Sequence, residues 1–290
     1  MIIQMSTLGR NGRFANQIFQ YFFLKLVKDE LGHEIRYPPW LGNQFFGIPQ
    51  SLELVETEVK FGFERLTGRN DAPADDFLRL NKIISTCGAN AIDITGYFQY
   101  HTRFLFKYKE LFLKTFSINP TLIQQVKNAI QKIKTSNQAL ISVHVRAGDY
   151  LLHENNHNYF WSPPMDSISI TLNNLLLADP ANIPLIYLAS DDIEYSSQQL
   201  KKDGISYVTK DNLFKGLNEV SSIAMDFISL VLADKLLISN SSYSFAAAML
   251  NTQAKIFLRP QPIDSKYISF DPWNEHVLLS KQSDIFQAKL

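Results

Sequence analysis

Apolar, strand-like segments alternate with helix-like segments over residues 139–260, and this alternation constrains the fold more than any other feature of the chain. The segments predicted as strands are ALISVHV, IPLIYLAS, ISYVT, KLLIS and AKIFLRP, the last strand of the chain. The stretches predicted as helices lie between them, at 162–177, 191–204, 218–234 and 240–250. Such alternation predicts an α/β fold with a parallel sheet covered on both faces, whose ligands bind beyond the carboxyl ends of the strands.

The first half of the chain begins in the same way. The strand-like MIIQMS leads through the loop TLGRNGRF into a helix whose apolar face runs from Ala15 to Val27 and which Gly32 ends. A further strand is predicted in AIDITGYFQY, and a helix follows it with Asn119 as cap and Pro120 at its first position. The polar TSNQ at 135–138 then predicts the boundary between a first domain, 1–137, and a second domain, 138–290.

Composition narrows the classes of partner. The 28 basic and 28 acidic side chains cancel, so no overall field draws the chain to nucleic acid, and an anionic ligand needs a local site. Cys87 is the only cysteine, which excludes an intrachain disulfide and a thiolate zinc cage. With no signal peptide and no apolar run long enough to cross a membrane, the sequence predicts a cytoplasmic protein, and docking at the inner face of a membrane stays an open alternative.

Polar residues cluster at the predicted ends of strands. His144, Arg146 and Asp149 surround the end of ALISVHV, where the planar fork of Arg146 suits a phosphate or carboxylate and Gly148 lets backbone approach closely. The alternative is an ion pair between Arg146 and Asp149 at a turn, with His144 a hydrogen-bonded core residue.

Two further strand ends repeat the pattern. Asn240, Ser241 and Ser242 stand at the start of a helix, where backbone N–H groups favour an anion, although plain helix capping is the alternative. Ser190 and Asp191 also lie between a strand and a helix, where capping or a hydrogen bond to a ligand is favoured over a metal, because the chain has no Asp-x-Asp.

A fourth polar segment is the loop GRNGRFANQ, whose glycines and arginines can offer donors to a diphosphate, although it is not the dinucleotide-binding fingerprint. The four segments together predict a phosphorylated ligand in a cleft between two α/β halves. Asp226 adds a carboxylate on the same helix face as Ile223 and Leu230. It would be satisfied by the two donors of a guanine edge or, equally, by a salt bridge to a lysine or arginine.

The motifs resemble those of one family. HVRAGDY resembles the His-x-Arg-Arg-Gly-Asp-Tyr motif of the α-1,2-fucosyltransferases of glycosyltransferase family 11. GRFANQIFQY is similar to that family's N-terminal motif, and closer still to the Gly-Arg-Phe-Gly-Asn-Gln of protein O-fucosyltransferases. ASDDIEY and the later ISNSSYSFAAAML look like its Ser-Asp-Asp and Ser-Asn-Ser-Ser-x-Ser motifs.

The resemblance implies a GT-B architecture of two facing Rossmann-like domains, with GDP-fucose bound mainly by the second. It implies inverting transfer of fucose to the 2-hydroxyl of a galactoside without a metal or a cofactor. Arg146 is implied to bind the pyrophosphate, His144 to contact the nucleotide or orient Arg146, and Asp226 to read guanine. Ser241 and Ser242 are implied to hold phosphate. The residues implied to close the site from the first, acceptor-side domain are Gly12, Arg13, Phe14 and Asn16.

Departures from the family pattern leave alternatives. Ala147 replaces the motif's second arginine, so the chain could be a non-catalytic nucleotide- or glycan-binding module, or a transferase for another nucleotide sugar. Candidates for a general base are Asp149, His153 and Glu154, unless a loose, oxocarbenium-like state needs little base. Aromatic side chains of the first half that could stack on acceptor sugars, or form core, are Trp40, Phe45, Phe46, Tyr97 and Tyr100.

Overall fold

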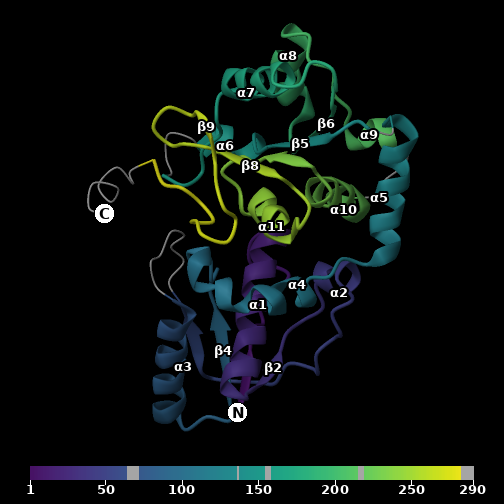
Figure 1. Cartoon of the computed structure of the whole chain (residues 1–290). Coiled ribbons are helices and arrows are strands. Elements are labelled where there is room, and N and C mark those ends of the chain that lie inside the picture. The colour runs from purple at the N-terminus through teal and green to yellow at the C-terminus, as the bar shows by residue number, and fades with distance from the viewer. Residues whose placement is uncertain (64–71, 136, 154–157, 215–218, 282–290) are drawn as a thin grey trace. The chain divides into compact units, whose positions relative to one another are not determined.

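The computed structural model describes residues 1–63, 72–135, 137–153, 158–214 and 219–281. The chain forms two compact units, and Figure 1 shows the elements of each. The first contains residues 1–119 and 273–277, and the second contains 120–272 and 278–290. Both are α/β units built around a largely parallel sheet, so the GT-B fold class is confirmed in its two Rossmann-like units.

The first unit is built on a four-stranded parallel sheet. In spatial order its strands are β2 (Glu34–Arg36), β1 (Ile2–Gln4), β4 (Ala91–Thr95) and β3 (Lys60–Gly62). Its helices are α1 (Phe14–Leu31), α2 (Leu41–Phe45), α3 (Pro73–Cys87), α4 (Lys109–Thr115) and the short 3₁₀ turns η1 (Thr102–Phe104) and η2 (Phe106–Tyr108).

Helix α1 confirms the predicted N-terminal helix and its end. Gly32 follows it in the left-handed conformation, with φ of 69°, and donates its N–H to the carbonyl of Lys28. Most of the helix is buried, including Gln17 and Gln20, which lie outside the predicted apolar face. The strand predicted over 91–100 is shorter, because β4 ends at Thr95 and Phe98 adopts a positive φ of 52° that no strand accommodates.

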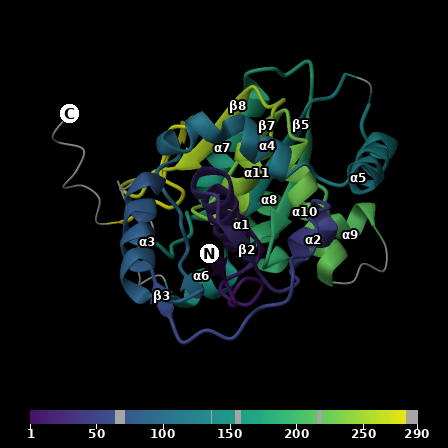
Figure 2. The same cartoon turned by 90° about the horizontal axis from the view of Figure 1, so that it is seen from below.

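The second unit has a five-stranded sheet in the order β6 (Leu185–Ser190), β5 (Leu140–Val145), β7 (Lys235–Leu237), β8 (Ile256–Pro260) and β9 (Tyr267–Ser269). Figure 2 shows β5, β7 and β8 side by side in this order. The helices are α5 (Pro120–Ile133), α6 (Gly148–His153), α7 (Met165–Leu177), α8 (Ile193–Lys202), α9 (Lys210–Leu213), α10 (Glu219–Val231) and α11 (Ser242–Leu250).

Two predictions about this sheet were wrong. AKIFLRP is not the last strand: β9 follows it and pairs antiparallel with β8, so the sheet is not wholly parallel. The connection 261–266 is too short for the crossover that parallel neighbours need. The predicted strand 205–209 is reduced to one parallel bridge between Val208 and Tyr187, at the free edge of β6.

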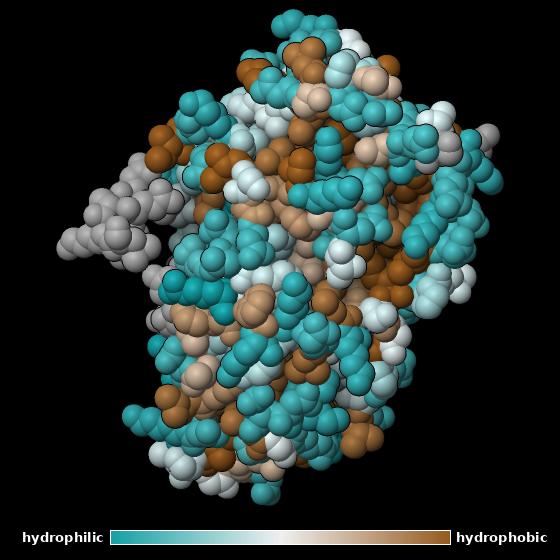
Figure 3. Space-filling model, in the orientation of Figure 1, coloured by the Kyte–Doolittle hydropathy of each residue, from teal (hydrophilic) through white to brown (hydrophobic). Residues whose placement is uncertain are grey.

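Helix α5 lies in the second unit and packs against α10, with Val126 and Ile130 buried. Its outer face is hydrophilic (Figure 3). The division of the chain therefore falls between Asn119 and Pro120, whereas the sequence placed the boundary after residue 137. The polar TSNQ segment follows α5 within the second unit, because the apolar stripe of α5 is covered by that unit's own helix α10.

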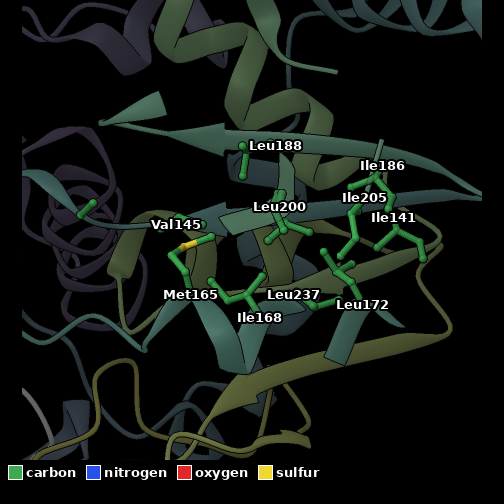
Figure 4. Close-up of a cluster of buried hydrophobic side chains, with 12 residues drawn as sticks. Ile141, Val145, Met165, Ile168, Leu172, Ile186, Leu188, Leu200, Ile205 and Leu237 are labelled. Carbon is green, nitrogen blue, oxygen red and sulfur yellow. The ribbon is translucent and has the colours of Figure 1, made fainter. Parts of the chain in front are cut away.

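Strand β5 presents two different faces. Ile141, Val143 and Val145 belong to an apolar cluster with residues of α7 and α8, which Figure 4 shows in close-up. Ser142 and His144 point to the opposite face, where Ser142 Oγ donates to the carbonyl of Ser229 on α10 (2.8 Å). The sheet is thus buried on both sides, and the polar side chains of the strand are buried with hydrogen-bond partners.

Candidate functional site

The second sheet has a topological switch point between β5 and β7. The chain passes from β5 to β6 on one side and later returns to add β7 and β8 on the other. In open α/β sheets, ligands bind in the crevice that this reversal leaves outside the carboxyl ends of the strands. Arg146 follows β5 at this edge, and 238–241 follow β7 and lead into α11. His144 Nδ1 lies 2.7 Å from Ser239 Oγ. The strand end that carries Arg146 and the serine-rich segment before α11 are thus brought together.

Arg146 is held at this edge by three neighbours. Its Nη1 donates to Asp191 Oδ2 (2.5 Å) and its Nη2 to Asp149 Oδ1 (2.6 Å), while the guanidinium lies 4.9 Å from the centroid of the Tyr150 ring. Only 11% of the Arg146 side chain is exposed. The ion pair between Arg146 and Asp149, which the sequence offered as an alternative, is present. The segment with Ser190 and Asp191 joins the same cluster, because Asp191 bonds Arg146.

Asp191 also fixes the backbone after Arg146. Its Oδ1 accepts a hydrogen bond from the N–H of Ala147 (2.9 Å). A Cβ atom on Gly148 would lie 2.6 Å from Asp191 Oδ2, so the glycine is what allows this close approach. The carboxylate therefore orients both the side chain of Arg146 and the turn that carries it.

The adjacent acids Asp191 and Asp192, which follow β6, have different roles. Asp192, not Asp191, caps α8 by accepting from the N–H of Tyr195 (3.0 Å). Ser190 Oγ donates to the carbonyl of Asp192 (3.0 Å) and lies 2.8 Å from Ser196 Oγ, so this hydroxyl shapes the start of α8. Two adjacent acids after a strand could not be told apart by spacing alone.

We expect Asp191→Asn to weaken the binding of a diphosphate at Arg146 more than Asp149→Asn does. The side chain of Asp191 is 25% exposed and bonds both Arg146 and the Ala147 N–H, whereas the side chain of Asp149 is 41% exposed and therefore holds Arg146 less firmly. Isothermal titration of the two variants with pyrophosphate checks this by comparing their affinities. Equal losses would contradict the positioning role given to Asp191.

His144 is a buried, neutral histidine. It is 5% exposed, bonds Ser239, and its ring centroid lies 5.2 Å from that of Tyr243 on α11. Burial, and next the positive charge of Arg146, lower the pKa of His144 from 6.5 to about 3. Its position beside both the Arg146 strand end and α11 agrees with a role in orienting the site.

The lowered pKa of His144 predicts a pH effect on stability. In the unfolded chain His144 takes up a proton as the pH falls through 6.5, whereas the folded protein resists protonation until about pH 3. The free energy of unfolding therefore decreases over this interval. The drop in Tm between pH 7 and pH 5 should be smaller for His144→Gln than for the wild type, and parallel Tm profiles would contradict this.

The polar residues at the start of α11 make two kinds of contact: one caps the helix, and another bonds distant backbone atoms. Ser241 is the N-cap of α11 and its Oγ accepts from the N–H of Tyr243 (3.3 Å), while Ser242 is the first helical residue and is partly exposed. Asn240 instead bonds backbone atoms: its Nδ2 donates to the carbonyls of Tyr159 (2.8 Å) and Leu279 (2.9 Å). Leu279 N–H donates to its Oδ1 (2.8 Å). Asn240 thus anchors the C-terminal segment, a contact no local pattern could reveal.

Asp226 is buried on the α10 side of the sheet, 7% exposed. Its Oδ1 accepts from Tyr187 Oη and its Oδ2 from Lys210 Nζ, both at 2.8 Å, so the salt bridge that the sequence offered as an alternative is formed. Burial raises the pKa of Asp226 against the opposing charge of Lys210. The neighbouring Phe227 ring lies 5.3 Å from that of Tyr243, which links Asp226 to the start of α11.

The N-terminal motif lies in the first unit, between β1 and α1. Gly12 has φ of 78°, and a Cβ there would lie 2.5 Å from Asn16 Nδ2. Arg13 is exposed at the N-cap position of α1, and Asn16 Oδ1 accepts from Gln99 Nε2 (2.7 Å). Phe14 is 5% exposed and stacks on Phe46, so it belongs to the core of this unit and is not placed for ligand contact.

The aromatic residues considered for acceptor stacking are mostly core. Trp40, Phe45, Phe46 and Tyr100 are all buried, and Tyr97 alone of the five is partly exposed. Among the candidate bases, Asp149 bonds Arg146, and Glu154 lies outside the described residues. Within the described part of the chain, no group of three or more His, Cys, Asp or Glu side chains could hold a metal ion. None of the described helices is long and apolar enough to span a membrane.

Known proteins are similar to this chain in sequence or in fold. The O-antigen biosynthesis glycosyltransferase WbnK of Escherichia coli is 25% identical over 213 residues, 72% of this chain and 67% of its own. The NodZ α-1,6-fucosyltransferase crystallised with GDP matches with a TM-score of 0.58 at 12% identity, covering 93% of this chain and 98% of its own. POFUT1 in complex with GDP matches with a TM-score of 0.56 at 12% identity, covering 87% and 96%. The model of glycosyl transferase family 11 matches residues 2–275, and the chain belongs to this family.

Proposed function

We propose that the protein transfers L-fucose from GDP-fucose to the 2-hydroxyl of a galactoside, with inversion and without a metal. Family membership supports glycosyl transfer, and the fold shared with NodZ soaked with GDP-fucose supports this donor. The observation that carries the proposal is the placement of Arg146 at the switch point, next to the strand end that leads into α11. A cation and a helix N-terminus at one edge suit a diphosphate.

The chemistry requires charge stabilisation on the leaving group. When the bond between fucose and the β-phosphate breaks, negative charge grows on GDP, and donors that are already in place lower this barrier. The Arg146 guanidinium is shared by two carboxylates. A diphosphate would replace the more exposed Asp149, while Asp191 keeps Arg146 oriented. Asp149, three residues after Arg146, is our candidate for the general base.

The acceptor is proposed to be a galactoside of a surface glycan. The name of WbnK places that relative in O-antigen biosynthesis, which supports a carbohydrate acceptor for this chain. In the first unit, the partly exposed ring of Tyr97 is suited to stacking on a sugar face, and the partly exposed Asn16 is suited to a hydrogen bond with a sugar hydroxyl.

A transfer assay with product analysis tests the proposal. Incubation with GDP-fucose and lactose in EDTA should release GDP in step with a fucosylated product. NMR of this product should show an α-fucosyl residue on O2 of galactose. An unchanged rate on adding Mg²⁺ is expected. Fucose on another hydroxyl would overturn the linkage, and activity only after adding metal would overturn metal independence.

A further inference from the structure

Lys210 and Asp226 form an ion pair at the α10 side of the second sheet. Lys210 is the first residue of α9, Asp226 lies on α10, and Tyr187 reaches the same carboxylate from β6. The Asp226 side chain is 10% exposed and that of Lys210 is 20% exposed. Burying a charge this deeply costs desolvation free energy, and a salt bridge alone rarely offsets that cost. Both side chains keep part of their surface open to solvent, which is where a ligand would approach them.

The hydrogen-bonding capacity left on this pair has a definite pattern. Each Asp226 oxygen has two lone-pair directions and uses one of them, on Tyr187 and on Lys210 respectively. An ammonium group has three N–H donors, and the bond from Lys210 to Asp226 uses one. Two N–H donors of Lys210 thus remain beside two acceptor positions, on a carboxylate that Tyr187 keeps in place, and one of these donors is enough for a donor–acceptor–acceptor pattern.

The edge of guanine carries the complementary pattern, namely the O6 acceptor followed by the N1–H and N2–H donors. We propose that Lys210 is a specificity-determining residue, whose ammonium donates to O6 of the guanine base while Asp226 accepts from N1–H and N2–H. This inference rests on the proposed use of GDP-fucose. Adenine would set an amine against the ammonium and a ring acceptor against the carboxylate, so the same pair rejects it.

The position of the pair fits a nucleotide whose diphosphate lies at Arg146. From Asp226, a line of contacts runs through Phe227 to Tyr243 and from Tyr243 to His144, two residues before Arg146. Tyr243 Oη also donates to the carbonyl of Ile223, one turn before Asp226 on α10 (2.7 Å). The base and diphosphate subsites are therefore joined by packed side chains on one face of the same unit.

Equilibrium binding of nucleoside diphosphates tests the role of Lys210 without turnover. The probes are GDP, IDP, which keeps O6 but lacks the N2 amine, and ADP. Lys210→Met should weaken GDP and IDP equally, by roughly 10-fold or more, and leave ADP unchanged. Lys210→Arg, which keeps a cationic donor, should retain most GDP affinity. Lys202→Met, at the exposed C-terminal end of α8, is the matched control and should bind like the wild type.

The ratio of GDP to IDP affinity separates base reading from structural support. If Lys210 only keeps Asp226 in its charged form, the Lys210→Met variant would bind the N2 amine of guanine less well. The ratio of GDP affinity to IDP affinity would then fall. An unchanged GDP affinity in Lys210→Met, or a collapsed ratio, overturns the inference. If that variant fails to fold, 6-thio-GDP serves instead, because its sulfur is a poorer acceptor and the wild type should bind it more weakly than GDP. Absence of fucosyl transfer by a wild type that binds GDP would overturn the proposed function and leave this inference standing.

Discussion

Arg146→Ala should lower kcat for fucosyl transfer by roughly 100-fold or more, with a smaller change in KM for GDP-fucose. The guanidinium lies at the switch point with 11% of its side chain exposed, and Asp191 and Asp149 orient it. A hydrogen-bond donor that is already in position acts mainly on the charge that develops in the transition state. Removing one such hydrogen-bond donor raises the activation free energy by roughly 2.7–4 kcal/mol in comparable sites. Initial-rate kinetics with GDP-fucose and lactose provide the measurement.

Two companion variants make this result interpretable. Arg146→Lys keeps the charge but loses the two-pronged geometry, so it should recover only part of the rate. Arg79→Ala removes an exposed arginine, paired with Asp76 in the first unit, and should leave kcat unchanged. Full activity in Arg146→Ala would show that the leaving diphosphate is stabilised elsewhere.

Ala147→Arg should destabilise the second unit by roughly 3 kcal/mol or more, although it restores the family's double arginine. Ala147 is 0% exposed and belongs to the apolar cluster with Val145, Met165 and Ile168. A guanidinium there would overfill a packed core and bury a charge without a partner. Urea unfolding followed by circular dichroism should give a lower midpoint than the wild type.

Ala178→Arg is the matched control for this substitution. Ala178 is exposed at the C-terminal end of α7, where a cation is favoured by the helix dipole, so its unfolding midpoint should not fall. A stable and more active Ala147→Arg would mean that the missing arginine is a lost catalytic group. It would contradict the burial of position 147 in the core of the second unit.

Much of the site edge could be predicted from strand order and strand ends. The carboxyl ends of parallel strands share one edge, so Arg146, Asp191 and the serines before α11 were expected near one another. Helix α1 was equally predictable, since its apolar pattern and the glycine that ends it are local signals. Both inferences rest on local sequence and on general rules for parallel sheets.

The remaining features depend on contacts between distant segments. The amide of Asn240 bonds Leu279, thirty-nine residues away, and Phe14 stacks on Phe46, so neither is available as the motifs suggested. Lys210 was overlooked because its partner Asp226 lies on another helix. The edge strand β9 was missed because three residues carry no measurable period.

A donor panel tests the proposed fucosyl transfer most directly. Wild-type protein is given lactose in EDTA with GDP-fucose, GDP-mannose or UDP-galactose in turn, and release of the nucleoside diphosphate is measured against transfer of sugar. We expect product from GDP-fucose alone, with one GDP released for each fucose transferred. Transfer from a different nucleotide sugar, or tight GDP binding with no transfer from GDP-fucose, would contradict the proposed function.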